Sequence, residues 1–434
     1  MKIAIVGSGI SGMSCGWLLH RKHDVTVFEA GSYVGGHTNT VDVDLNGQSI
    51  SVDTGFIVCN DRTYPNFLKL IDHLRVSRRP TEMSFSVRCD ETGVEYSGSG
   101  LNGLFVQRRN LMRPAFLRMV ADILRFNRQG TRDASLISHK MTVGEYLENN
   151  KYGKGFAEHY LLPMGAAIWS CPTGAFRDFP IRFILEFYHH HGLLSITNRP
   201  QWYVIQGGSR CYVDVLTNPF RDNIQLNTPV LSVKRDGSAV EVRTKSGVQV
   251  FDEIIFACHS DQALHLLESP TETERTLLSA FPYSPNEAVL HTDTSVLPRN
   301  PKAWCSWNYR VCPEVQHAAT LTYNMNILQH IEASETLCVT LNDVSRISPD
   351  RVLSRFQYSH PVFSIQRHAM QARHSEVIRS DRTSFCGAYW GNGFHEDGVN
   401  SALAVCSQFG ATDILDTDLS NAAACEAGQR MVEA

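Results

Sequence analysis

The chain begins with the feature that most restricts its fold, a short apolar strand that runs directly into a glycine-rich turn. Residues 2–6 (KIAIV) are apolar and rich in β-branched side chains, which is typical of a buried parallel strand. The turn Gly7-Ser-Gly-Ile-Ser-Gly12 follows, and residues 13–21 have helical composition. A second apolar run, residues 25–28, ends on Glu29. Strand, glycines, helix, strand and acid in this order predict a Rossmann-type dinucleotide site.

The glycines and the acid each have a physical task in such a site. Gly7 permits the tight turn, and Gly9 lets the backbone approach a pyrophosphate. Gly12 permits close packing of helix on strand, while the helix N-terminus offers unpaired N–H groups to the phosphates. Glu29 follows about 20 residues later, where its carboxylate can accept the ribose hydroxyls.

Two later segments favour FAD over NAD. Gly35-Gly-His37-Thr38 comes soon after the acid, and Val52-Asp-Thr-Gly-Phe56 follows it. Both resemble the FAD-binding segment of the flavin amine oxidase superfamily, where a Gly-Gly pair and a basic residue lie along the pyrophosphate and ribityl chain. That superfamily usually has Arg at the position of His37, and a histidine there can still form a hydrogen bond to a phosphate.

The same resemblance implies that the FAD domain is discontinuous and is completed near the C-terminus. Residues 385–402 contain the end of an apolar strand, a glycine-rich turn and a predicted helix that starts near Gly398 and continues to about Phe409. Small residues let this helix sit close to a flat ring, and its N-terminus suits the flavin N1/O2 edge, which gains negative charge on reduction.

Two central segments fit the same plan. Residues 225–244 are predicted to form strands around a turn at 235–237, and Val230 stands where related proteins reach the adenine through their backbone. Residues 252–258 are predicted to form another buried strand that passes Ala257 beside the cofactor. The motif and the resemblance together assign FAD contacts to Gly7, Ser8, Gly9, Ser11, Gly12, Glu29, Ala30, Gly36, His37, Thr38, Gly55, Phe56, Val230, Ala257, Gly387 and Val399.

These segments predict the fold class and its domains. We expect an α/β plus α+β protein, in which a discontinuous Rossmann-type FAD-binding domain (GR2-like flavoprotein) carries an inserted substrate domain with a mixed sheet and a helical cap. The expected bounds are 1–60, 205–265 and 380–412 for the FAD domain, 61–204 and 266–379 for the substrate domain, and 415–434 for a small, polar tail.

The inserted region contains a helical segment with two interpretations. Residues 110–128 place Phe116, Met119, Val120, Ile123, Leu124 and Phe126 at mostly helical spacing, with arginines between them. An amphipathic helix that faces the core explains this pattern. A helix on a membrane surface explains it too, because basic and aromatic residues favour anionic headgroups.

Other classes of site and partner are disfavoured. A net charge of -4 argues against nucleic acid as the main partner. The twelve cysteines include no C-x-x-C pair, and the adjacent histidines 189–191 would point in different directions on a helix, so no metal site is expected. We see no signal peptide and no apolar run of the ~18 residues that a membrane span needs. A cytoplasmic protein is expected, with a peripheral position at the membrane left open.

Further segments resemble one bacterial branch of the superfamily, whose members are described as NAD/FAD-binding or amine-oxidase-like flavoproteins. The resemblance covers about residues 1–410 and includes the segments 81–86, 159–170, 200–209 and 303–309. It implies a link to modification of unsaturated fatty acyl chains, because relatives often accompany methyltransferases similar to cyclopropane-fatty-acid synthases. An apolar or lipid substrate is therefore expected, with a membrane surface or such a methyltransferase as candidate partner.

The leading hypothesis is an FAD-dependent oxidoreductase that oxidises or desaturates such an acyl chain by hydride transfer to flavin N5. The alternatives are an amine oxidase, for which Lys302 is the basic residue nearest the 304–307 segment, a double-bond isomerase, and a non-enzymatic flavoprotein partner. In the flavin-facing loop, Tyr389, Trp390 and His395 are the catalytic candidates, with His395 the titrating or orienting group. Aromatic residues assigned to the substrate pocket are Trp202, Trp304, Trp307 and Tyr309.

Overall fold

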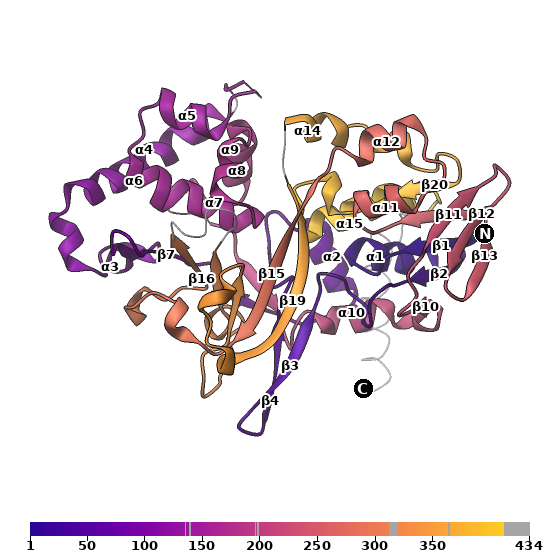
Figure 1. Cartoon of the computed structure of the whole chain (residues 1–434), viewed down its shortest axis with the longest axis horizontal. Coiled ribbons are helices and arrows are strands. Elements are labelled where there is room, and N and C mark those ends of the chain that lie inside the picture. The colour runs from indigo at the N-terminus through magenta and orange to yellow at the C-terminus, as the bar shows by residue number, and fades with distance from the viewer. Residues whose placement is uncertain are drawn as a thin grey trace, which may run out of the picture.

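A computed structural model describes residues 1–134, 136–138, 140–195, 197, 199–311, 320–362 and 365–411, and the structural statements below concern these residues. Two lobes flank a central group of sheets (Figure 1). One lobe contains the N-terminus and strands β1 and β2, and the other consists of helices from residues 100–190. The predicted tail, 415–434, and residue 412 lie outside the described residues.

A five-stranded parallel sheet forms the centre of the first lobe. Its strand order is β10-β2-β1-β14-β20. The strands are β1 (Lys2–Val6), β2 (Asp24–Phe28), β10 (Ile224–Gln225), β14 (Glu253–Phe256) and β20 (Thr383–Phe385). Since β1 and β20 both pair with β14, the two ends of the chain share one sheet.

Two helices from opposite ends of the chain pack together on this sheet. Helix α1 (Ile10–Leu19) contacts α15 (His395–Ser407), and every residue of α1 is buried. The contact is close at Gly398, where a Cβ atom would lie 2.6 Å from Ile10 Cγ2. Helix α15 begins three residues before the predicted start, because the Asp397 carboxylate accepts the Phe394 N–H (2.9 Å) and defines the first turn there.

Smaller elements surround this parallel sheet. They comprise the antiparallel sheet β11 (Ser232–Arg235), β12 (Val240–Thr244) and β13 (Gly247–Phe251), the hairpin β3 (Thr40–Leu45) and β4 (Gln48–Asp53), the sheet β5 (Val58–Asn60), β9 (Trp202–Ile205) and β6 (Arg78–Thr81), and helices α2 (Pro65–His73), α10 (Arg210–Thr217), α11 (Ser260–Leu266) and α12 (Glu272–Leu278).

A seven-stranded mixed sheet lies between the lobes, in the order β19-β15-β18-β17-β16-β7-β8. It is mixed because β16 pairs with β7 in parallel, whereas the other pairs are antiparallel. The strands are β7 (Phe85–Cys89), β8 (Glu95–Ser97), β15 (Tyr283–His291), β16 (Trp307–Val311), β17 (Leu321–Asn324), β18 (Cys338–Leu341) and β19 (Val352–Pro361). Helix α13 (Met325–Leu328) adjoins it. Helix α14 (Ile365–Gln371) follows β19 and contacts the loop before α15, because Arg367 and Gln371 donate to the Tyr389 and Gly391 carbonyl oxygens.

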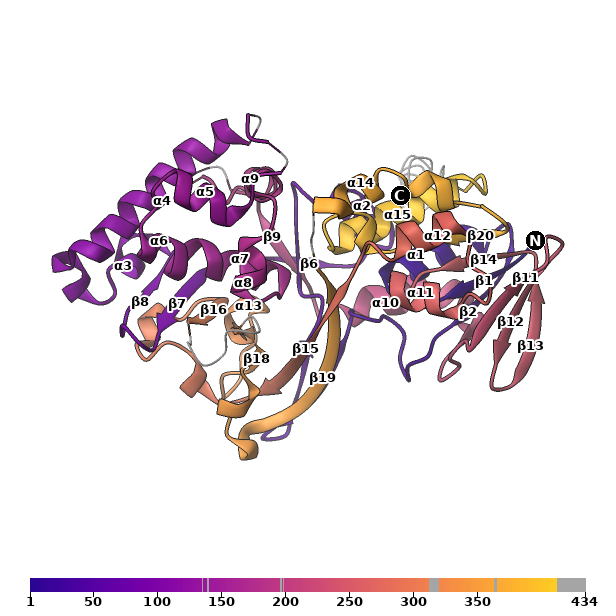
Figure 2. The same ribbon diagram turned by 45° about the horizontal axis from the view of Figure 1, so that its top comes forward.

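The helical cap covers one end of the mixed sheet around its own hydrophobic core (Figure 2). Its helices are α3 (Gly100–Leu104), α4 (Pro114–Asp133), α5 (Val143–Asn149), α6 (Lys154–Phe156), α7 (Leu162–Trp169), α8 (Thr173–Arg177) and α9 (Ile181–His190), with a π-helical turn, Ala157–Leu161, before α7. In α4, Phe116, Met119 and Phe126 face the core as expected, whereas Leu124 is 52% exposed. Within the described parts of the chain, no helix is long and apolar enough to cross a membrane.

Candidate functional site

One cavity of about 810 Å³ extends from the glycine turn before α1 to the helical cap. Gly9, Ser11 and His37 line one end of the cavity, and Met164 and Ile168 of α7 line the other. Residues from both ends of the chain form its walls, because Gly387 and His395 also line it. The cavity therefore connects the expected cofactor position with the inserted domain.

The glycine turn has room for a pyrophosphate at one point only. A Cβ on Gly7 would lie 2.9 Å from the Ala257 carbonyl oxygen, and one on Gly12 would lie 2.0 Å from the Gly7 carbonyl oxygen. A Cβ on Gly9 would have no heavy atom within 4 Å. Gly7 and Gly12 thus permit close packing, while the space beside Gly9, at the N-terminus of α1, fits a phosphate.

Glu29 stabilises this turn from the end of β2. Its carboxylate accepts the Ser8 N–H (2.9 Å), the Ser8 hydroxyl (2.5 Å) and the Gly31 N–H (2.7 Å). Neither Glu29 nor Ser8 lines the cavity. The ribose contact of Glu29 stays a prediction.

The other predicted cofactor contacts outside the cavity lie in positions that differ from one residue to the next. Val230 lies in a hydrophobic core cluster, and Val399 is buried on the α1 side of α15. The Thr38 hydroxyl is 2.6 Å from the Tyr212 hydroxyl. Ala30 is exposed, and a Cβ on Gly36 would lie 3.2 Å from Gly9 Cα. Any contact they make with FAD is a prediction.

His37 occupies the position at which the superfamily usually has arginine, and it lies among other histidines. Its ring centroid is 5.3 Å from that of His360 and 5.9 Å from that of His259. Burial, followed by the proximity of His259, lowers the pKa of His37 to about 4, and burial lowers the pKa of His259 to about 4 and of His360 to about 3. All three rings are therefore neutral near pH 7.

The Nε2 atom of His37 is buried and has no hydrogen-bond partner among the described residues. It belongs to a side chain that lines the cavity near Gly9. A buried polar atom without a partner is costly, and a phosphate oxygen would satisfy it if Nε2 carries the proton. The residues at this end of the cavity therefore fit the pyrophosphate of FAD.

His395, the first residue of α15, contacts Thr38, which comes after β2, and Tyr212 of α10. Its Nε2 atom lies 3.0 Å from the Thr38 hydroxyl and 3.0 Å from the Tyr212 hydroxyl. Burial, followed by the proximity of His37, lowers the pKa of His395 well below its usual value. Since the ring holds no second proton near pH 7, His395 is suited to positioning its neighbours, not to acid–base exchange.

The loop before α15 contributes one of its two predicted aromatic residues to the cavity. Tyr389 lines it, and burial raises the pKa of Tyr389 well above its usual value, so the phenol stays protonated. Trp390 does not line the cavity, because it is buried against Phe281 and stacks on His374 with ring centroids 4.2 Å apart. Trp390 is therefore part of the core in this structure, and its catalytic role stays a prediction.

The predicted substrate pocket is placed only in part. Trp202 and Trp307 line the cavity. Trp304 does not, because its indole N–H donates to the Pro298 carbonyl oxygen (2.8 Å) outside the cavity. Tyr309 does not either, since it is buried in a small core cluster that includes Ala166 of α7.

The sequence analysis did not predict several residues that line the cavity. Most of those from the cap and the adjoining strands are apolar or aromatic: Phe85, Tyr160, Met164, Ile168, Phe187, Leu193 and Tyr323. Polar residues of the same region, Ser99, Ser170 and His191, line the cavity too. Met164 and Ile168 are four residues apart on α7, so a helical pattern places them on one face, but it does not show what that face contacts. The cavity lining also includes Glu82 and Arg199, and both are exposed, which puts these charges at its rim.

A parallel sheet completed by both ends of the chain, a glycine turn with space for pyrophosphate and an adjoining inserted domain define a two-domain flavoprotein. The chain belongs to the flavin-containing amine oxidoreductase family, whose sequence model matches residues 10–408. It is therefore an FAD-dependent oxidoreductase. No curated protein matches the chain in sequence.

Solved structures share this fold over most of their length. A putative protoporphyrinogen oxidase from Exiguobacterium sp. 255-15 has a TM-score of 0.67 at 16% identity, covering 94% of this chain and 98% of that one. A CLA-producing fatty acid isomerase from P. acnes has a TM-score of 0.66 at 13% identity, covering 94% and 98%. Cyclohexylamine oxidase from Brevibacterium oxydans IH-35A has a TM-score of 0.61 at 15% identity, covering 94% and 99%. At these identities the likeness shows the fold alone.

Proposed function

We propose that this enzyme oxidises or desaturates an unsaturated fatty acyl chain, methylated or carried on a phospholipid. The main support for this proposal is the apolar character of the end of the cavity that the cap forms. Aliphatic, thioether and aromatic side chains form most of its lining, with the polar side chains of Ser170 and His191 among them, and the formal charges in the described lining, Glu82 and Arg199, are at the rim. Such a wall favours an apolar chain over a charged group, because burying an unpaired charge is costly.

The residues have limited tasks in this reaction. Bound FAD would supply the hydride acceptor, N5. The apolar wall formed by Met164, Ile168 and Phe187 would hold the acyl chain and exclude water from the reacting C–H bond. His395, neutral and hydrogen-bonded, would keep the wall beside the flavin in place. Removal of a hydride from an activated C–H bond needs no strong base, and the second hydrogen would leave the resulting cation as a proton, which solvent at the rim of the cavity would accept.

An amine oxidase is the second candidate, and Glu82 is the observation that favours it. A carboxylate at the rim could attract a cationic amine, although no charged partner lies deeper in the described lining. Lys302, the sequence candidate for a lysine near N5, is exposed and does not line the cavity. A double-bond isomerase is the third, since the fold is shared with a fatty acid isomerase and the same apolar wall would serve.

One anaerobic experiment separates these functions. Purified holoprotein is mixed with unsaturated phospholipid, with methylated acyl lipid and with amines, and the oxidised flavin band is followed. Bleaching by either lipid, together with a product that has lost two hydrogens, supports the proposal. Bleaching by amines alone would refute it, and a rearranged lipid without bleaching would assign the isomerase function.

A further inference from the structure

The outer surface of the helical cap exposes large apolar side chains in an unusual concentration. Leu101, in α3, is 76% exposed, and Met112, at the end of the 3-10 turn Arg108–Met112 between α3 and α4, is 82% exposed. Leu111, Leu117 and Leu124 are 50%, 43% and 52% exposed. We call these five residues and the arginines among them, 108–128, the cap face. Single exposed leucines are ordinary, but a group within 24 consecutive residues indicates a binding surface.

Helix α4 presents this face on the side away from the cap core. Phe116, Met119 and Phe126 are buried on one side of the helix. Leu117, Leu124 and Arg128 follow at spacings of seven and four residues, so they lie together on roughly the opposite side. In Figure 1 the face belongs to the end of the cap that is farthest from the parallel sheet. The apolar side chains there are therefore not part of the core that folds the cap.

The cap face is also strongly basic. Residues 100–133 contain seven arginines and two aspartates, although the whole chain has a net charge of -4. The aspartates are engaged inside the fold: Asp122 accepts the Gly153 N–H (2.9 Å), and Asp133 accepts the Tyr146 hydroxyl (2.8 Å). Asp122 also pairs with Arg125 (3.0 Å) and, at 3.9 Å, with Arg118, whose side chain is 68% exposed, so the arginines still outnumber the aspartates by seven to two. The outward charge of this face is therefore positive.

We propose that the cap face docks on a lipid bilayer with anionic headgroups. Exposed Leu and Met side chains would enter the headgroup and acyl boundary, and the arginines would contact lipid phosphates. A nucleic acid would use the arginines, but it would give the apolar side chains no partner. Docking goes beyond the proposed reaction and does not depend on it. Gly98 and Ser99, directly before α3, line the cavity, so the docked face would adjoin the substrate space.

The test is flotation of the holoprotein with vesicles. We expect binding to vesicles of phosphatidylcholine containing phosphatidylglycerol, and weaker binding to phosphatidylcholine alone or at high salt. The variant Arg118→Glu/Arg128→Glu should bind the anionic vesicles at least about tenfold more weakly. Leu111→Glu/Met112→Glu should also weaken binding about tenfold or more, although it leaves every arginine in place.

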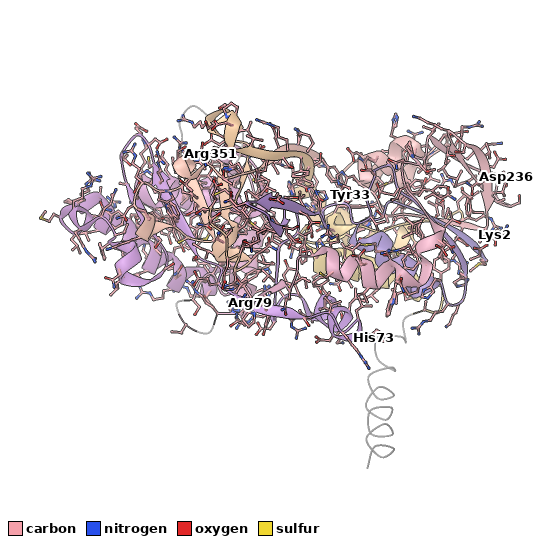
Figure 3. All side chains as sticks on the ribbon, turned by 90° about the horizontal axis from the view of Figure 1, so that it is seen from below. Lys2, Tyr33, His73, Arg79, Asp236 and Arg351 are labelled. Atoms are coloured by element: carbon pink, nitrogen blue, oxygen red, sulfur yellow. The ribbon has the colours of Figure 1, made fainter. Side chains whose placement is uncertain are left out.

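The matched control is Lys245→Glu/Val250→Glu, because Lys245 is exposed and Val250 is 57% exposed. Lys245 is in the turn between β12 and β13, and Val250 is in β13. This sheet lies at the opposite end of the molecule from the cap, where Asp236, in the turn between β11 and β12, is labelled (Figure 3). The control should bind as the wild type does. An equal loss in the control, no binding to anionic vesicles, or full binding by Leu111→Glu/Met112→Glu would each overturn the proposal.

A second readout separates docking from the reaction. Each variant is assayed with detergent-dispersed substrate and with the same substrate in anionic vesicles. Loss of turnover on vesicles only, by the cap variants only, supports docking. Wild-type binding to vesicles with no turnover of any lipid would leave docking standing and refute the proposed function. Binding of a DNA duplex in place of vesicles would assign the face to nucleic acid.

Discussion

The imidazole of His395 lies almost flat on the phenyl ring of Phe56, with ring centroids 3.5 Å apart and 14° between the ring planes. Phe56 follows β4 in the N-terminal part of the chain, and His395 starts the last described helix. Both line the cavity. The pair therefore joins the two ends of the chain in the wall of the cavity, and the hydrogen bonds of His395 to Thr38 and Tyr212 fix the position of the imidazole.

If His395 positions this wall, its substitution by an isostere should be mild. In His395→Gln we expect the substrate to reduce the flavin at a rate within about threefold of the wild-type rate, because the glutamine amide can still form a hydrogen bond with Thr38 or Tyr212. His395→Ala should be slower by about tenfold, the cost of leaving one buried hydroxyl without its partner. Stopped-flow reduction under anaerobic conditions measures both.

The pH profile of the same reaction distinguishes positioning from acid–base catalysis. Since the pKa of His395 lies well below its usual value, no break from this residue is expected between about pH 6 and 9. A break in that range that disappears equally in His395→Gln and His395→Ala would show that His395 exchanges a proton in the reaction.

The cofactor turn gives the second prediction. Gly9 has an extended backbone (φ -65°, ψ 178°) and open space at its Cβ, so Gly9→Val should fold but should fill the room for pyrophosphate. FAD retention should fall by more than about tenfold, at least ~1.4 kcal/mol of binding. The ratio of flavin to protein absorbance and the far-ultraviolet circular dichroism measure retention and folding.

Gly174 provides the matched control for that variant. A Cβ there also has no heavy atom within 4 Å, and Gly174 is exposed in α8, outside the cavity. Gly174→Val should keep its FAD. If Gly9→Val purified with a full complement of flavin, the pyrophosphate would lie elsewhere and the assignment of this turn would be wrong.

The Rossmann part of the fold could be predicted because its signals are local. A strand, Gly7, Gly12 and Glu29 stand in fixed order, and each has the packing or hydrogen-bonding task that its residue type suggests. The start of α15 was placed three residues late because the prediction relied on Gly398. In the structure Gly398 permits contact with α1 inside the helix, and Asp397 defines the start.

The substrate end of the site could be predicted less well. The element that packs over a given side chain depends on the whole fold and not on the neighbouring sequence. Trp307 and Tyr309 are two residues apart on β16, so both point to the same side of the sheet. Trp307 faces the cavity, whereas α7 covers Tyr309 with Ala166 and Ala167. The histidines 259 and 360 come from distant segments and meet His37 only in the fold, so no spacing in the sequence indicated this cluster.

That histidine cluster predicts how stability depends on pH. His37, His259 and His360 have folded pKa values of about 4, 4 and 3, below the value of about 6.5 in an unfolded chain. The unfolded state then binds more protons, so stability is full above pH 6.5 and is lost as the pH falls toward 4. Each histidine contributes at most about 1.4 kcal/mol per pH unit to the loss.

Two buried carboxyl groups oppose this effect. Burial raises the pKa of Asp53 and of Asp397 to about 6, so their contribution is present at low pH and is lost as the pH rises through 6. Between pH 4 and 6 they offset part of the histidine effect. Asp343 and Glu396 also have raised pKa values, but His191, His291 and His374 have pKa values of about 4 as well. The net slope of the apoprotein should still be positive there, because the histidines with lowered pKa values outnumber the carboxyl groups with raised ones.

FAD should flatten this slope. A pyrophosphate beside His37 would favour the protonated ring and raise its folded pKa toward 6.5. Urea unfolding of apoprotein and holoprotein at pH 7, 6 and 5 measures how the free energy of unfolding depends on pH in each form. In His37→Gln this dependence should be the same with and without FAD. An equal slope with and without FAD would place His37 away from the phosphates.

The cap end of the cavity gives the last prediction, which concerns chain length. Ile168 of α7 lines this end, so Ile168→Trp should shorten the space for an acyl chain. Reduction of the flavin by long-chain substrates should slow by about tenfold or more, while short-chain substrates and FAD content stay close to wild type. The control Leu136→Trp adds comparable bulk to the cap at a residue that is 74% exposed and outside the cavity. It should change neither the rate with long chains nor the rate with short chains. An equal loss for long and short chains in Ile168→Trp would show that the acyl chain does not extend into the cap.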